Sequence, residues 1–241
     1  MNQRDMRPPF AALGGTIPPE LEKLPTPCYL LDEDALTRNA EILGGLAQRT
    51  GCKVLLAQKA FSNYDCYPLL APHLAGTEAS GLFEARLGAE EMPGKEVHVF
   101  CAAYRADEMD ELVQYADHIV FNSPAQLAKF APGSRLGTTR AQWNAAVAAN
   151  PALPNLLDGL HFHTLCEQDS DALATTLDAV AQKFGDLLPR MQWLNFGGGH
   201  HITRPGYDIA MLERCITRAQ QDWGVTVYLE PGEACALNAG F

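Results

Sequence analysis

A rhythm of short apolar runs separated by longer amphipathic stretches constrains the fold of this 241-residue chain more than any other feature. Each short run has the length and composition of a β-strand, and the stretches between the runs have helical spacing. Such alternation is typical of strand-helix units that build a parallel sheet. The seven predicted strands are 53–57, 77–80, 96–101, 118–121, 159–163, 193–196 and 226–230.

The predicted helices lie between these strands, and several begin at an Asp that can cap them. They cover 34–49, 107–116, 123–130, 169–184 and 208–223. With 47% hydrophobic residues, the chain can bury one sizeable core, so we expect a single domain at 27–241 after an irregular leader at 1–26. The apolar run 27–31 is predicted to form a short strand at the start of that domain.

The rhythm breaks once, after the predicted helix 123–130. A loop rich in Pro and Gly follows at 131–135 and leads directly into another helical pattern. An eight-stranded barrel needs its fifth strand at this place. Either the barrel is incomplete or residues are absent between Phe130 and Ala131. In the second case, the Cα atoms of these two residues lie much farther apart than the roughly 3.8 Å across a trans peptide bond.

Charge and cysteine usage exclude several classes of function. The formal net charge of -11 disfavours a nucleic-acid surface and mildly favours cationic small molecules as partners. The seven cysteines are scattered without a CxxC pair, which predicts neither a disulfide framework nor a zinc knuckle. The histidines show no ligand spacing such as HExxH, so no metal is expected. Because no signal pattern and no apolar run of about 18 residues is present, we expect a cytoplasmic protein without a membrane partner.

Two charged side chains lie at the ends of predicted strands, where barrel enzymes build their sites. Lys59 follows the strand 53–57, and a desolvated amine at this position can be a nucleophile that forms a Schiff base. Glu230 ends the strand 226–230, and its carboxylate can keep a ring nitrogen protonated. Taken singly, a lysine that extends into solvent and a solvated acid beside a turn are the more frequent explanations.

A histidine and a glycine turn complete the set. His163 ends the strand 159–163, where its imidazole can stack on an aromatic cofactor, although a structural histidine is more common. Gly197, Gly198 and Gly199 follow the strand 193–196 and let backbone N–H groups approach an anion such as a phosphate. A triple glycine alone is more often a tight turn.

A Lys, a His, a glycine turn and an acid, in that order at the ends of the strands counted as one, six, seven and eight, match one family. The chain resembles the fold-type III, alanine-racemase-like pyridoxal-phosphate decarboxylases, whose barrel is a (β/α)8 TIM barrel. The order agrees when the missing strand is counted as the fifth. Within this group the chain is most similar to the carboxynorspermidine decarboxylases, from about Pro25 onward. The motifs that carry this similarity are 56–61, 79–88, 161–167, 197–200 and 230–234.

The resemblance implies roles for these residues. Pyridoxal 5'-phosphate (PLP) is the implied cofactor: Lys59 binds it as a Schiff base, His163 stacks on its ring, the glycine turn holds its phosphate and Glu230 faces its ring nitrogen. Glu233 and His200 are expected to bind the substrate. The implied reaction is decarboxylation of carboxynorspermidine or carboxyspermidine to norspermidine or spermidine plus CO2 in polyamine biosynthesis. The family also implies a homodimer with shared active sites and a C-terminal β-domain, which 27–241 does not contain.

Two departures from the family pattern affect specificity. Ornithine and diaminopimelate decarboxylases usually read Glu-Pro-Gly-Arg at the last strand, and this chain has Glu233 in place of the Arg. An acid there favours a cationic end of the substrate. The same relatives place Ser or Gly where this chain has Cys166 and Glu167, so their phosphate contacts cannot be transferred.

Two other functions remain open from the sequence. The first is a decarboxylase of the same fold that acts on diaminopimelate or a basic amino acid, which Glu233 disfavours. The second is a non-catalytic PLP carrier built from a lone barrel. A carrier has no need of a protonated ring nitrogen, so the carboxylate of Glu230 argues against it.

Overall fold

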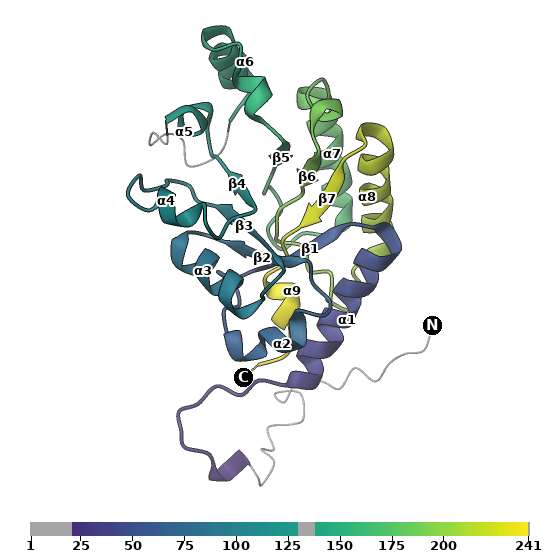
Figure 1. The fold of residues 1–241 in the computed structure, drawn as a ribbon. Coiled ribbons are helices and arrows are strands. Elements are labelled where there is room, and N and C mark those ends of the chain that lie inside the picture. Colours follow the sequence, from purple (N-terminus) through teal and green to yellow (C-terminus); the bar gives the residue numbers. More distant parts are fainter. Residues whose placement is uncertain (1–20, 130–137, 241) are drawn as a thin grey trace.

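Seven parallel strands form one sheet that curves into a nearly closed barrel (Figure 1). The structure is a computed structural model that describes residues 21–129 and 138–240. The strand order is β4-β3-β2-β1-β7-β6-β5, so the first and last strands of the chain are neighbours. All seven predicted strands are confirmed, with ends that differ by at most two residues. Their bounds are β1 Lys53–Ala57, β2 Gly76–Ala79, β3 Glu96–Phe100, β4 His118–Val120, β5 Gly159–His161, β6 Trp193–Asn195 and β7 Thr226–Leu229.

The barrel is open between β4 and β5, the place where the sequence predicts that the fifth strand is missing. Within the described residues, α5 (Pro124–Lys129) and α6 (Arg140–Ala149) follow one another without a strand between them. The predicted interruption between Phe130 and Ala131 lies outside the described residues. A cleft of about 620 Å³ lies at the opening, and residues of both edge strands line it.

Helices α1, α3 and α8 pack on the outside of the sheet, α7 packs beside α8, and α9 packs on α1. Asp32 caps α1 by accepting a hydrogen bond from the Ala35 N–H at 2.9 Å, and the helix ends at Gly51, whose φ of 71° is left-handed. The helix predicted at 169–184 and the one predicted at 208–223 are confirmed as α7 and α8. The bounds are α1 Glu33–Thr50, α2 Tyr67–Leu70, α3 Leu82–Glu91, α4 Met109–Leu112, α7 Ser170–Phe184, α8 Ile209–Trp223 and α9 Glu233–Ala236, with 3-10 turns at Leu21–Lys23, Tyr64–Cys66, Leu153–Leu156 and Leu188–Arg190.

Two predicted elements differ in the structure. The prediction of a strand at 27–31 is wrong. Leu31 forms only an isolated antiparallel bridge with Gly240, and Tyr29 is 95% exposed, so a single bridge is too little pairing to make this segment a strand. The helix predicted at 107–116 contains only one α-helical turn, α4. Its two buried residues, Met109 and Leu112, are one helical turn apart, so a single turn is enough to cover the core cluster that contains Val97 and Val99 of β3.

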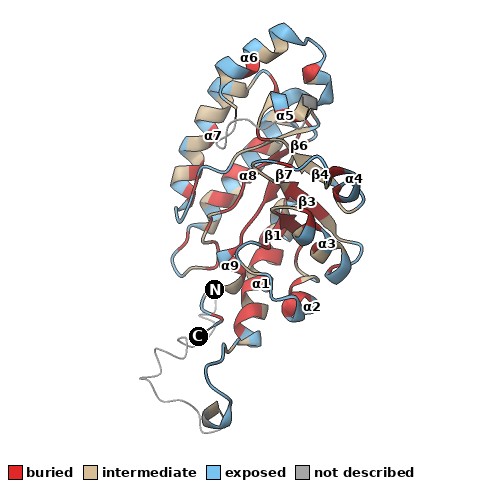
Figure 2. Ribbon diagram, turned by 90° about the vertical axis from the view of Figure 1, so that its left-hand side faces the viewer, coloured by how far each residue is buried: buried red, intermediate tan, exposed pale blue. Residues whose placement is uncertain are grey.

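The core fills the space between the outer surface of the sheet and the inward faces of the helices, as the buried residues in Figure 2 show. Leu56 of β1 packs in the main cluster with Leu43 and Leu46 of α1 and Leu229 of β7, and all four are fully buried. None of the described helices is long and apolar enough to cross a membrane.

Leu56→Ala is expected to lower the free energy of unfolding by about 2 to 5 kcal/mol, because it removes buried methyl groups and leaves a cavity. Leu156→Ala is the matched control, since Leu156 is 56% exposed and its loss should change stability by no more than about 0.5 kcal/mol. Urea unfolding followed by circular dichroism measures both. Equal effects of the two substitutions would contradict the assigned core.

Candidate active site

Lys59 lies just beyond the carboxyl end of β1 and is paired with a carboxylate from the neighbouring strand. Its Nζ donates to Oε2 of Glu78, which lies in β2. The Lys59 side chain is 46% exposed, whereas that of Glu78 is 1% exposed. The amine therefore lies at the mouth of the barrel, and its acidic partner lies inside. The predicted placement of Lys59 at a strand end is confirmed by the course of β1.

Glu230 follows β7 and points into the same interior. It is 2% exposed, and both of its oxygens have partners. Asn195 donates from Nδ2 to Oε1 at 2.7 Å, and Nε2 of His161 lies 3.1 Å from Oε2. The carboxylate is thus fixed by groups from β6 and β5 and is available only toward the barrel interior.

The two buried carboxyl groups titrate differently. Burial, followed by the charge of Glu230, raises the pKa of Glu78 to about 7. Burial also opposes ionisation of Glu230, but His161, Lys59 and the Asn195 hydrogen bond outweigh it and hold the Glu230 pKa below its ordinary value. Because like charges disfavour a doubly ionised pair, the proton of the pair resides on Glu78. Near neutral pH the interior therefore contains an ionised Glu230 beside a Glu78 that is partly protonated.

The glycine turn after β6 packs so closely on its neighbours that side chains do not fit. A Cβ on Gly198 would lie 2.4 Å from the Glu230 carbonyl oxygen, and one on Gly199 would lie 1.7 Å from that of Leu165. Gly197 and Gly199 have φ values of 72° and 85°, which a left-handed backbone requires and glycine adopts without strain. The turn therefore joins the end of β7 to the loop after β5.

His163 is placed by this turn. The Gly198 N–H donates to His163 Nδ1 at 3.1 Å, so a neutral ring carries its proton on Nε2. Burial, with a smaller effect from the positive charge of Lys59, lowers the His163 pKa and favours this neutral form. The Gly197 N–H donates to Asn195 Oδ1 at 2.8 Å. Two amides of the turn thus position side chains, which the sequence alone did not predict.

The two residues predicted to bind substrate differ in accessibility. Glu233 begins α9 with a side chain that is 57% exposed, and its Oε2 lies 3.0 Å from Nε2 of His201. His200 is 1% exposed, its Nε2 has no hydrogen-bond partner, and burial lowers its pKa to about 4. A contact between His200 and a substrate therefore stays a prediction.

Sequence reasoning missed Glu78, Asn195 and His161 as members of this site. An acid within the predicted strand 77–80 was the available signal for Glu78, because a charged residue in a buried strand needs a partner. His161 and His163 are two residues apart, so both lie on one face of an extended strand, but this spacing alone does not show that His161 contacts Glu230. No local pattern linked Asn195 to Glu230, since 35 residues separate them.

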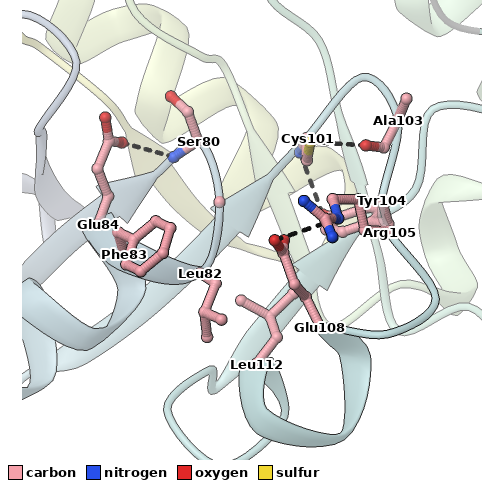
Figure 3. A pocket seen from close by; sticks show the side chains of 11 residues that line it. Ser80, Leu82, Phe83, Glu84, Cys101, Ala103, Tyr104, Arg105, Glu108 and Leu112 are labelled. Carbon is pink, nitrogen blue, oxygen red and sulfur yellow. Dashed lines mark hydrogen bonds and ion pairs between the residues drawn. The ribbon is translucent and has the colours of Figure 1, made fainter.

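A second pocket, of about 320 Å³, lies beside the carboxyl ends of β2 and β3 (Figure 3). Glu84 accepts a hydrogen bond from the Ser80 N–H at 2.6 Å and so fixes the start of α3, and Arg105 forms an ion pair with Glu108 at 3.3 Å. None of the predicted site residues lines this pocket. The interior around Lys59 and Glu230 is the better candidate because it combines a nucleophile with fixed acids.

Comparison with known proteins identifies related decarboxylases. No protein-family model matches the chain. The chain is 37% identical over 91% of its length to a carboxynorspermidine/carboxyspermidine decarboxylase of Campylobacter jejuni, and 38% identical over 92% to a carboxyaminopropylagmatine decarboxylase of Synechocystis sp.. It spans 63% and 64% of the length of these two relatives.

Two solved structures that this chain resembles are also decarboxylases. The structure of carboxynorspermidine decarboxylase from C. jejuni, complexed with norspermidine, superposes with a TM-score of 0.83 at 39% identity, over 90% of this chain and 62% of that one. Diaminopimelate decarboxylase from Helicobacter pylori has a TM-score of 0.76 at 16% identity, over 92% of this chain and 67% of that one, which shows the fold alone. The resemblance predicted from the motifs and the α/β barrel class are confirmed.

The raised pKa of Glu78 predicts a protonated carboxyl group that titrates near pH 7 in the folded chain. The unfolded chain keeps this group ionised down to about pH 4.5, so between these values the folded state binds more protons, and this group's contribution to stability falls as the pH rises. Infrared difference spectra should show a carboxylic-acid band with a midpoint near pH 7 that Glu78→Gln removes. Glu230→Gln should keep the band and lower its midpoint, since a neighbouring negative charge is lost. A band that survives Glu78→Gln would contradict this assignment.

Proposed function

Over about nine tenths of its length the chain is similar to carboxynorspermidine/carboxyspermidine decarboxylases, and from this similarity we propose that it is the cofactor-binding part of a PLP-dependent decarboxylase of carboxylated triamines. The proposed reaction converts carboxynorspermidine or carboxyspermidine to norspermidine or spermidine plus CO2. The observation that carries the proposal is the convergence of the Lys59 amine and the buried carboxylate of Glu230 within one barrel mouth.

The residues present fit PLP. An amine at the mouth suits its aldehyde, and a fixed, ionised acid suits its ring nitrogen. The glycine turn has no side chain that would obstruct a phosphate, although Gly197 and Gly198 already use their amides to hold side chains. Buried polar atoms without a partner, Glu78 Oε1 and His200 Nε2, leave hydrogen-bonding capacity around the same interior. A polar ligand would satisfy such groups better than an apolar one.

We assign each role to a residue of this chain. Lys59 would hold the cofactor covalently, His163 would lie against its ring, and Glu230 would face its ring nitrogen. When bound, PLP supplies an electron sink for the electron pair left behind by the departing CO2. Glu230 stays ionised because His161 and Asn195 hold it, and an ionised acid keeps a proton on the nitrogen it faces.

Glu78 would act as a positioning residue for Lys59. It contacts the amine directly, and its pKa near neutrality lets it hold a proton or release one to the amine as the charge in the site changes. Gln58 fixes the relative position of the two strands, because its N–H donates to the Glu78 carbonyl at 3.0 Å. The amine therefore stays at the mouth while its protonation state changes.

The substrate class follows from the exposed acid. The Glu233 carboxylate lies one residue beyond the turn that follows Glu230, and it is exposed enough to meet a distal ammonium group. His201, at 3.0 Å, would orient it. An acid at this position favours a polyamine over a substrate with a second carboxylate, which is the observation that separates this proposal from a diaminopimelate decarboxylase.

The state of the whole protein is part of the proposal. We infer a cytoplasmic homodimer whose active sites are completed by a C-terminal β-domain, as the family resemblance implies. All seven cysteines are free, which is consistent with a reducing compartment. A lone PLP carrier is the weaker alternative, because the hydrogen-bonded burial of Glu230 would serve no purpose in it.

Lys59→Ala should abolish covalent attachment of PLP. Borohydride reduction of the PLP-treated protein, followed by peptide mass spectrometry, should find the label on Lys59. Lys183→Ala is the matched control, since this exposed lysine lies on α7, and labelling should be unchanged. A reducible adduct of equal yield on another lysine of the Lys59→Ala protein would refute the assignment.

Glu233→Gln should reduce kcat/KM for the carboxytriamine by an amount equivalent to about 1.5 to 3 kcal/mol, because a charged hydrogen bond to the distal amine is lost. The full-length enzyme is used, so that the residues beyond the barrel are present. PLP affinity should stay nearly the same. If the substitution releases PLP and leaves kcat/KM unaltered at saturating cofactor, Glu233 belongs to the cofactor site instead.

A further inference from the structure

A cluster of ligating side chains lies inside the barrel, toward the amino ends of the strands and away from Lys59. Glu96 begins β3, His98 follows two residues later on the same face, and His118 begins β4. His98 and His118 are register partners in the parallel pair, and their ring centroids are 4.4 Å apart. Strand pairing therefore brings one carboxylate and two imidazoles together from segments that are distant in sequence.

The donor atoms are close enough for a single ion. One ligand atom from each of the three residues lies within 4.8 Å of the others. Nε2 of His98 is 3.3 Å from Oε2 of Glu96. Two ligands of a tetrahedral Zn²⁺ are also roughly 3.3 Å apart, because Zn–N and Zn–O bonds are each about 2.0 to 2.1 Å long.

The cluster also contains unsatisfied polar atoms. His98 is 1% exposed, yet its Nδ1 has no hydrogen-bond partner, and the neighbouring Trp193 Nε1 is likewise buried without one. A purely structural network would be expected to satisfy these buried nitrogens.

We propose that Glu96, His98 and His118 form a binding site for a divalent transition-metal ion, with Zn²⁺ as the preferred ion. Two imidazoles and one carboxylate are a ligand set that suits zinc and disfavours Ca²⁺ or Mg²⁺. A bound ion would tie β4, an edge strand of the open barrel, to β3. The site is independent of the proposed decarboxylase function, and local sequence spacing could not reveal it because the ligands come from two strands.

Lys53 competes with the metal for Glu96. Its Nζ contacts Oε1 of Glu96, and the Tyr228 hydroxyl donates to Oε2 at 3.0 Å. The positive charge of Lys53 would repel a cation. Removing the Lys53 charge should therefore increase the affinity for the metal. If the cluster only stabilises the fold, the same substitution should bring no gain in metal affinity.

Titration of the EDTA-treated, PLP-saturated protein with Co²⁺ tests the proposal, because Co²⁺ reports its ligands through visible absorption bands. One Co²⁺ per chain should bind and be displaced by Zn²⁺. His98→Gln and His118→Gln should each weaken Co²⁺ binding about tenfold or more, because loss of a residue that merely hydrogen-bonds a metal ligand already has an effect of this size. His118 is half-buried, so its substitution should disturb the fold little. His73→Gln, at a partly buried histidine outside the cluster, should leave binding unchanged.

Lys53→Met should lower the Kd for Co²⁺. Addition of Co²⁺ should therefore raise the unfolding temperature of the Lys53→Met protein by more than it raises that of the parent protein. Binding that both cluster substitutions leave unaltered, or no saturable binding at all, would overturn the proposal. A Lys53→Met protein that binds Co²⁺ more weakly than the parent would also overturn it. If the His98→Gln protein fails to fold, the His118→Gln and Lys53→Met proteins still show whether the cluster binds the metal.

Discussion

One cation and two carboxyl groups share the interior of the barrel mouth, and the geometry of the site depends on how their charges balance. The Lys59 amine contacts Glu78, and the charge of Glu230 is one reason that Glu78 retains a proton near neutrality. Two negative carboxylates in a poorly solvated interior would repel each other, so the pair is stable with one proton and one nearby ammonium group. A ligand that removes the Lys59 charge must therefore change the protonation of Glu78. Binding at the Lys59 amine is thus coupled to the protonation state of Glu78.

The backbone keeps these groups in register. The Ala57 N–H donates to the Pro231 carbonyl at 3.2 Å, which joins the end of β1 to the turn after Glu230. The Glu230 N–H in turn donates to the Gly197 carbonyl at 2.9 Å, and the glycine turn holds His163. Gly232 is needed at the first of these contacts, because a Cβ there would lie 2.4 Å from that of Ala60. The side chains predicted from separate motifs are thus connected by an unbroken series of close backbone contacts.

The sequence predicted what periodicity and strand ends can determine. Seven strands followed from the alternation of short apolar runs with helical stretches. The placement of Lys59 and Glu230 at one end of the barrel followed from the convergence of parallel strand ends. The sequence could not predict the length of α4 or the lack of a strand at 27–31, because both depend on which elements lie next to these segments in the fold. Asn195 and Glu78 were missed for the same reason: their importance comes from partners on other strands. The unpartnered nitrogens around His98 also become visible only in three dimensions.

We propose that this barrel mouth serves the decarboxylation of a carboxylated triamine. The most direct test is the absorbance spectrum of the PLP-loaded, full-length enzyme during addition of carboxynorspermidine, compared with meso-diaminopimelate, with CO2 release measured in parallel. The triamine should change the cofactor spectrum and release stoichiometric CO2, whereas meso-diaminopimelate should do so far more slowly. Equal or faster CO2 release from meso-diaminopimelate, or a cofactor spectrum that responds to neither compound, would contradict the proposed activity.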